Sequence, residues 1–457
     1  MNKLLLAFYG DDFTGSTDAL EQLTRAGLRA ALFIQPPTPA QLKHFPELQA
    51  VGVAGLTRSL SAAAMAKKLR PAFKKLKALG ARHVHYKVCS TFDSSPEVGS
   101  IGRAIDLGMK IFRAPFVPLL VAAPSLGRYC VFGNLFARFG IGSDGAIHRL
   151  DRHPSVSRHP ITPMTESDLR LHLAKQTRKK IALFDILQVA LPANEARTAL
   201  RQMLTEKPDA VLFDALHPEH LAAIGGLVDT YASAKRPLFS VGSSGIEMAL
   251  GAFFNLGSSR PEEALTRFPG RKKEPPCVGR CENILVASGS CSPVTEQQIV
   301  RALKHGFAEV PLDIAALASH KTSGMEVRRV TEAAAKLLQT GASVIVHTTR
   351  GGSHGRLPAK LKGRTAPVLG TALGNILRNA LAQKPVRRLC LAGGDTSSYA
   401  ARALGIEALE IIAPLTPGAP LCRAFAPGSP VNGCEIVFKG GQVGAENYFE
   451  TVRRGKI

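Results

Sequence analysis

The chain of 457 residues is 45% hydrophobic and 20% charged, which is typical of folded globular proteins and argues against extensive disorder. Its length is sufficient for two domains, each with its own core. No apolar run reaches membrane-spanning length, and Leu4–Phe8 leads into Asp11 and Asp12 without a small-residue cleavage site, so we expect no signal peptide, no membrane partner and a cytoplasmic protein. The eight cysteines include no Cys-x-x-Cys pair, which favours reduced thiols over a zinc or redox site.

The net charge of +23, from 58 Lys and Arg against 35 Asp and Glu, suits either a nucleic-acid-binding protein or an enzyme for anionic substrates. The basic residues are dispersed over several segments, and the chain has no Trp and only 6% aromatic residues with which to stack on bases. We therefore predict a basic, solvated surface and no nucleic-acid partner.

The first half of the chain alternates strand-like apolar runs with amphipathic helical segments. Leu4–Gly10 is of strand length, and the polar turn after it leads into a helix. The alternation continues to the strand His83–Val88, which predicts an α/β fold with a largely parallel sheet. Ligands of such sheets lie beyond the carboxyl ends of the strands, so Asp11 and Asp12 are candidates for binding substrate hydroxyls, a proton or a metal ion. A pair that only caps the helix is an equally good alternative.

Polar clusters follow further strands. The run Lys87–Gly102 combines an ammonium, a carboxylate and several hydroxyls, which suit an acidic polyol or a proton transfer; a Ser- and Thr-rich turn without a ligand is the alternative. Arg128 follows a tight turn and offers the paired donors that a carboxylate prefers. The candidate substrate-site residues from these turns, and from the Ser-Ser-Gly turn before a later helix, are Lys87, Ser90, Thr91, Asp93, Ser94, Arg128, Ser243 and Ser244.

Residues 258–282 are rich in proline and basic residues and lack apolar periodicity, which predicts a linker between a domain at 1–257 and a domain at 283–457. In the second domain, two strands end in turns of Gly, Ser and Thr that lead into helices, so backbone amides and hydroxyls converge where phosphate could bind. No P-loop sequence is present, and spacing alone does not name a nucleotide. The candidate residues are Ser288, Gly289, Ser290, Ser292, Gly393, Gly394, Asp395 and Thr396.

Nine short segments also share a pattern with one family: Gly10–Ala19, Lys87–Ser94, Gly127-Arg128, His159–Leu169, Gly242–Gly245, Ser288–Ser292, Gly393–Ser397, Pro417–Pro420 and Lys439–Gly444. In these segments the chain resembles the four-carbon acid sugar kinases, which phosphorylate 3-oxo-tetronates, threonate, erythronate and related sugar acids with ATP. The resemblance extends over nearly the whole chain. It departs from many relatives just before Gly127, which leaves the identity of the acid open, and at Val443, where relatives usually have Phe.

The resemblance implies an ATP- and Mg²⁺-dependent kinase with two α/β domains and an active-site cleft between them. Residues 1–257 would bind the sugar acid, and residues 283–457, including Gly441 and Gly444, would bind the nucleotide. Arg128 and Lys87 would hold the substrate carboxylate. Asp12 or Asp93 would accept the proton of the attacking hydroxyl, and Asp12 is our first choice.

The substrate that we expect first is 3-oxo-tetronate, phosphorylated at a terminal hydroxyl. The altered turn before Arg128 favours a related branched oxo-acid, 3-oxo-isoapionate, as the alternative, and threonate and erythronate are further candidates. The alternative outside the enzymes is a basic nucleic-acid-binding protein. The sequence identifies no metal ligands and leaves the oligomeric state open, a homodimer included.

Overall fold

The computed structural model describes residues 4–139, 145–159, 161–255, 283–348, 365–441 and 443–455, without the side chains of His320 and Asp395. The predicted linker at 258–282 lies outside the described residues. The chain divides into two compact units, which consist of Met1–Ala31 with Pro36–Arg267 and of Leu32–Gln35 with Phe268–Ile457. Among the described residues, no helix is long and apolar enough to cross a membrane.

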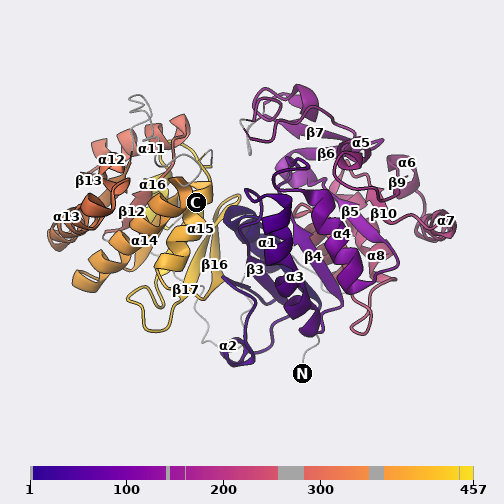
Figure 1. Ribbon diagram of the computed structural model, residues 1–457, viewed down its shortest axis with the longest axis horizontal. Coiled ribbons are helices and arrows are strands. Elements are labelled where there is room, and N and C mark those ends of the chain that lie inside the picture. Colours follow the sequence, from indigo (N-terminus) through magenta and orange to yellow (C-terminus); the bar gives the residue numbers. More distant parts are fainter. Residues whose placement is uncertain are drawn as a thin grey trace. The chain divides into compact units, whose positions relative to one another are not determined.

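The first unit is built on a parallel sheet with the strand order β3-β1-β4-β11-β5-β10-β9. Of these strands, Figure 1 labels β3, β4, β5, β9 and β10. Strands β1, β3, β4 and β11 are buried along their whole length, as is typical of parallel sheets covered by helices. The strands of this sheet are β1 (Leu6–Gly10), β3 (Ala50–Ala54), β4 (His83–Lys87), β5 (Val117–Leu120), β9 (Ile181–Phe184), β10 (Ala210–Phe213) and β11 (Leu238–Gly242). Strand β2 (Ala30–Phe33) begins in the first unit and ends in the second.

Helices pack on this sheet through aromatic and aliphatic side chains. Helices α3 and α4 lie side by side (Figure 1), and the Phe73 ring of α3 contacts the rings of Tyr9, Tyr86 and Phe239 from three strands. Helix α1 packs against α9. The helices of this unit are α1 (Phe13–Arg25), α2 (Pro39–Lys43), α3 (Ala62–Ala78), α4 (Ile101–Phe112), α5 (Leu169–Ala174), α6 (Ile186–Val189), α7 (Ala193–Thr205), α8 (Pro218–Asp229) and α9 (Gly245–Asn255).

A small antiparallel sheet follows β5 in the chain and consists of β6 (Arg128–Val131), β7 (Asn134–Arg138) and β8 (Ile147–Arg149). The sequence analysis did not predict it. Its strands are three to five residues long and only partly buried, so their apolar alternation is too short to stand out. Arg128 is the first residue of β6, which fixes the backbone of this candidate substrate residue.

The second unit has the strand order β13-β14-β12-β15-β18-β17-β16, in which the first five strands are parallel and the last two antiparallel. The strands are β12 (Leu285–Ser288), β13 (Phe307–Pro311), β14 (Ser343–His347), β15 (Arg388–Ala392), β16 (Ala408–Thr416), β17 (Ala419–Phe425) and β18 (Glu435–Lys439). The helices are α11 (Pro293–Lys304), α12 (Ile314–Leu317), α13 (His320–Gln339), α14 (Thr365–Gln383), α15 (Gly394–Ala403) and α16 (Tyr448–Arg454).

The predicted α/β class with largely parallel sheets is confirmed. The hairpin of β16 and β17 was not predicted. Gly418, at φ +77°, lies in its turn, where glycine adopts a backbone conformation that other residues rarely take.

Candidate active site

The carboxyl ends of β1, β3 and β4 lie side by side in the first unit. Gly10 pairs with Ala54 on one side and with Lys87 on the other. Beyond the strands, the Asp11 amide donates to the Lys87 carbonyl at 2.8 Å, and the Thr57 amide donates to the Asp11 carbonyl at 2.8 Å. These backbone hydrogen bonds hold three loops together, so side chains that are far apart in the sequence converge at one edge of the sheet.

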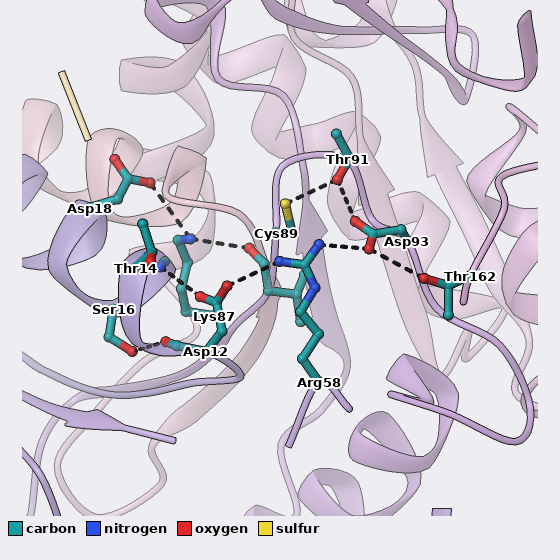
Figure 2. Close-up of polar contacts among 12 residues, drawn as sticks. Asp12, Thr14, Ser16, Asp18, Arg58, Lys87, Cys89, Thr91, Asp93 and Thr162 are labelled. Atoms are coloured by element: carbon teal, nitrogen blue, oxygen red, sulfur yellow. Dashed lines mark hydrogen bonds and ion pairs between the residues drawn. The ribbon is translucent and has the colours of Figure 1, made fainter. Parts of the chain in front are cut away.

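Arg58 links the two carboxylates that the sequence analysis considered as bases. Its two terminal nitrogens donate to Asp12 Oδ2 at 3.0 Å and to Asp93 Oδ2 at 2.7 Å, as Figure 2 shows. Arg58 is not among the residues predicted from the sequence. It lies four residues beyond Ala54, the last residue of β3, and the polar residues after this strand were the available signal.

The surroundings of Asp12 and Asp93 differ. Asp12 is the N-cap of α1 and its Oδ1 accepts a hydrogen bond from the Gly15 amide at 2.6 Å, while 19% of its side chain is exposed. The Asp93 side chain is 3% exposed and also accepts hydrogen bonds from the hydroxyls of Thr91 and Thr162 (Figure 2). Burial would raise the pKa of Asp93, but the Arg58 guanidinium and the Thr91 hydroxyl outweigh it and lower the pKa to about 2.

Asp11 is buried beside these groups, and its Oδ1 has no hydrogen-bond partner in the described part of the chain. Burial, reinforced by the neighbouring Asp12 carboxylate, raises the pKa of Asp11 to about 8. Asp11 is therefore mainly protonated at pH 7, and its carboxyl group can donate a hydrogen bond as well as accept one.

Lys87 is a buried cation at the end of β4. Its Nζ lies 3.6 Å from Asp18 Oδ2 and donates to the Val88 carbonyl at 3.2 Å (Figure 2). Burial would lower the pKa of Lys87, but the carboxylates of Asp18 and Glu247 outweigh it and leave the pKa raised. Lys87 is thus charged at neutral pH. The sequence analysis did not identify Asp18 or Glu247, which come from the helices α1 and α9.

Glu247 is fully buried, and its Oε1 lies 3.7 Å from Nε2 of the equally buried His85. Neither carboxyl oxygen has a hydrogen-bond partner within the described ranges. Burial raises the pKa of Glu247 to about 8, against the attraction of Lys87, and burial together with Lys87 lowers the pKa of His85 to about 3. Both side chains are therefore mainly neutral at pH 7.

The remaining predicted hydroxyls have different environments. Ser90 and Thr91 are partly exposed. The Ser94 hydroxyl donates to the Phe92 carbonyl and contacts His172 and Gln176 of the α5 segment, and the Ser243 hydroxyl donates to the Val121 carbonyl. Ser244 Oγ is buried and has no hydrogen-bond partner in the part of the chain described. The structure therefore engages Ser94 and Ser243 in contacts within the fold and leaves the Ser244 hydroxyl available.

Arg128 is buried with its guanidinium bonded only in part. One terminal nitrogen donates to the carbonyls of Leu126, Gly127 and Arg138 at 3.1 to 3.2 Å, while Nε has no hydrogen-bond partner among the described residues. Burial lowers the pKa of Arg128. A buried guanidinium with an unused donor favours an anionic ligand such as a carboxylate.

The predicted nucleotide loops of the second unit are joined by backbone hydrogen bonds. The Gly289 amide donates to the Ala392 carbonyl and the Gly393 amide to the Lys439 carbonyl, both at 2.9 Å, so the loops after β12, β15 and β18 lie together. Ser292 caps α11 by accepting from the Val294 amide at 3.3 Å, and Thr396 donates to the Gly393 carbonyl at 3.4 Å. The side chain of Asp395 lies outside the described residues.

Glycine is required where these loops approach one another. A Cβ on Gly441 would lie 2.8 Å from Ser290 Oγ, and one on Gly289 would lie 3.0 Å from the Thr396 side chain. Gly393 has φ +138°, and Gly444, at φ +86°, lies against Tyr448. Among the described residues, a Cβ on Gly394 would meet no atom within 4 Å. The loops are thus tightly packed except at Gly394, where the described residues leave room for a phosphate to approach the backbone.

Among the described residues, no group of three or more His, Cys, Asp and Glu side chains could hold a metal ion. Mg²⁺ in nucleotide sites is commonly bound by one or two carboxylates together with the phosphates.

Comparisons with known proteins identify both units. Family models for a sugar-binding N-terminal domain and a nucleotide-binding C-terminal domain match residues 6–250 and 285–449. A 3-oxo-isoapionate kinase from Paraburkholderia graminis is 43% identical, over 99% of this chain and 95% of the relative. A 3-oxo-tetronate kinase from Methylobacterium radiotolerans is 30% identical, over 98% of both chains.

A solved structure shares the fold. The crystal structure from Salmonella typhimurium LT2, described as that of a tRNA synthase, has a TM-score of 0.76 and 26% identity to this chain and covers 99% of both chains. This structure and the two named kinases each match nearly the whole length of the chain. The chain therefore belongs to the four-carbon acid sugar kinase family and is a phosphotransferase.

Proposed function

We propose that the protein transfers the γ-phosphoryl group of ATP, bound with Mg²⁺, to a terminal hydroxyl of a sugar acid. The acid binds at the strand ends of the first unit and the nucleotide at the loops after β12, β15 and β18 of the second. The observation that carries the proposal is the pair of buried cations in the first unit, Arg128 and Lys87, of which Arg128 has an unused donor. Such cations suit the carboxylate of an acid.

The substrate that we propose is 3-oxo-isoapionate. The support is the 43% identity to a kinase of that name, against 30% to a 3-oxo-tetronate kinase, together with the altered turn before Arg128. From the sequence alone we expected 3-oxo-tetronate first and 3-oxo-isoapionate second, and this choice reverses that order. 3-Oxo-tetronate remains the second candidate, since several relatives carry that name.

In phosphoryl transfer the protein mainly positions the reactants and neutralises charge. Arg128 and Lys87 hold the acid carboxylate, and Asp18 fixes the Lys87 ammonium. Asp12 accepts the proton as the hydroxyl oxygen forms its bond to phosphorus and the bond between the γ-phosphorus and the ADP oxygen breaks. Bound ATP supplies the phosphoryl group, and Mg²⁺ neutralises phosphate charge.

We favour Asp12 over Asp93 as the base for two reasons. The Asp12 side chain is more exposed, at 19% against 3%, and can therefore be reached by a substrate. Asp93 has a pKa of about 2, which makes it a weak base at neutral pH, far from the pKa that favours proton transfer. Although both oxygens of Asp12 accept hydrogen bonds, each carboxylate oxygen has a further lone pair for a proton.

The test measures ADP release from ATP with each of four acids: 3-oxo-isoapionate, 3-oxo-tetronate, threonate and erythronate. We expect acid-dependent release with the highest kcat/KM for 3-oxo-isoapionate. A higher kcat/KM for 3-oxo-tetronate would make that acid the preferred substrate without changing the proposed reaction. Salt-sensitive retention of DNA without acid-dependent release would favour the nucleic-acid alternative instead.

A further inference from the structure

Lys439 is a buried lysine at the carboxyl end of β18 and has 0% relative exposure. Its Nζ donates to Thr295 Oγ1 at 3.0 Å and lies 5.4 Å from the centre of the Tyr448 ring. Thr295 is in the first turn of α11, and its hydroxyl donates in turn to the Gly441 carbonyl at 2.9 Å. The ammonium is therefore coupled through one hydroxyl to the loop that follows β18.

No carboxylate balances this charge within the described residues. Lys439 contacts Thr295 of α11 and Tyr448 of α16, and Cys390 of β15 is the titratable group that would raise the pKa of Lys439 if it were ionised. Burial raises the pKa of Cys390 to about 12, so its thiol is neutral at pH 7 and supplies no countercharge. The N-terminus of α11, to which Thr295 belongs, carries a positive partial charge as well.

A buried cation beside a helix N-terminus is costly unless an anion compensates it. We expect the compensating anion to bind at the neighbouring loops. Gly441 packs against Ser290, and Gly289 against Thr396, so the loops after β12, β15 and β18 contact one another. Among the described residues, a Cβ on Gly394, in the loop after β15, would meet no atom within 4 Å. Backbone amides and hydroxyls in this arrangement suit phosphate oxygens.

We infer that Lys439 is a positioning residue for the nucleotide. The positive charge of Lys439, behind the three loops, attracts the polyphosphate. The hydrogen bond from Lys439 to Thr295 orients the loop at Gly441. The inference rests on the proposed nucleotide function of this unit and adds a residue to it. The ligand that we propose is a nucleoside polyphosphate. Inorganic phosphate presents the same charged oxygens and is the alternative ligand.

The structure also links nucleotide binding to pH. Burial lowers the pKa of Lys439 to about 8. A bound polyphosphate favours the charged ammonium and raises this pKa, so the protein takes up protons when nucleotide binds near pH 8.5. Because the measurement is made on the unmodified protein, no loss of folding can imitate it.

The experiment uses Lys439→Met in the full chain, which keeps the approximate length of the side chain and removes its charge. We expect ATP and ADP affinity in calorimetry to fall roughly ten- to hundredfold, as for the loss of a charge-assisted interaction. In kinetics, KM for ATP should rise while kcat and KM for the acid stay near those of the parent. The apo thermal midpoint should be unchanged or higher, since a buried charge without a countercharge has been removed.

The matched control is Lys304→Met, because Lys304 is exposed at the end of α11 and carries the same charge. Its ATP affinity should equal that of the parent. Titrations with inorganic phosphate and AMP distinguish the sources of the ligand: tight binding of ATP and ADP together with weak binding of phosphate supports a polyphosphate site, and equal binding of phosphate overturns it.

Two results would overturn the role of Lys439 alone. One is unchanged ATP affinity in Lys439→Met while the parent still shows acid-dependent ADP release. The other is the absence of proton uptake by the parent at pH 8.5, measured in two buffers of different ionisation enthalpy. A parent that neither binds ATP nor releases ADP would overturn the proposed function, and the role of Lys439 with it.

Discussion

Asp12 and Asp93 share one counter-ion, the Arg58 guanidinium, which bonds both carboxylates at 3.0 and 2.7 Å. Asp12 follows β1 and Asp93 lies in the loop after β4. Their connection through a residue after β3 makes the three strand ends one electrostatic unit. Substitution of any of these three residues should therefore change the electrostatic environment of the other two.

The first prediction separates the two carboxylates. Asp12→Asn keeps the shape and the helix cap, since Asn is also a good N-cap, but removes the basicity. Turnover should fall on the order of a hundred- to ten-thousandfold, while ATP affinity and the thermal midpoint change little. Steady-state kinetics and calorimetry measure these quantities. Asp93→Asn is the matched comparison and should act mainly on KM for the acid. An active Asp12→Asn beside an inactive Asp93→Asn would reverse the two roles.

A second prediction concerns Arg58 and acid stability. The pKa of Asp93 is lowered from 3.8 to about 2 in the folded protein, so Asp93 contributes stability that is present above pH 4 and is lost as the pH falls towards 2. Arg58→Met should remove most of this contribution, about 2 kcal/mol at pH 7, and flatten its dependence between pH 4 and 2.

Urea unfolding of the parent and of Arg58→Met at pH 7, 4 and 3 measures this contribution. Arg70→Met is a suitable control, because Arg70 is exposed on α3. Equal free energies of unfolding for Arg58→Met and the parent at pH 7 would show that the Arg58 bonds do not stabilise the fold.

The third prediction concerns Glu247. Its pKa is raised by burial from 4.5 to about 8, so the folded protein keeps a proton that the unfolded chain releases, and stability is lost as the pH rises from about 4.5 to 8. Glu247→Gln preserves the shape without titrating. The variant should gain stability over the parent as the pH rises, with little difference at pH 4.5 and the largest at pH 9. Thermal midpoints across this range provide the measurement, and a constant difference would contradict the raised pKa.

The fourth prediction tests the nucleotide loops. A Cβ on Gly394 meets no atom of the described residues within 4 Å, so Gly394→Val should fold normally and obstruct only a ligand that approaches this backbone. KM for ATP should rise at least tenfold, while KM for the acid and the thermal midpoint stay near those of the parent. Gly324→Val is a control, because a Cβ there also meets no atom within 4 Å in the part of the chain that the structure describes. Unchanged ATP binding by Gly394→Val would remove this loop from the nucleotide site.

The sequence by itself was enough for the α/β class, because buried parallel strands read as continuous apolar runs and the polar residues after them mark the strand ends. It also identified Asp12, Lys87, Asp93 and Arg128 as candidates, since charged residues at the ends of apolar runs and in the polar turns that follow them are conspicuous. It did not reveal the short strands β6, β7 and β8, whose few partly buried residues give too little periodicity.

Only the tertiary structure decided which of these side chains meet. Strand order in the sheet places the ends of β1, β3 and β4 together, and this order is not encoded in any local pattern. Arg58, Asp18 and Glu247 therefore joined the site only through their distances to residues of other elements. The environments of Lys439 and Asp11 also required the fold, because a pKa depends on burial and on neighbouring charges, which come from distant parts of the chain.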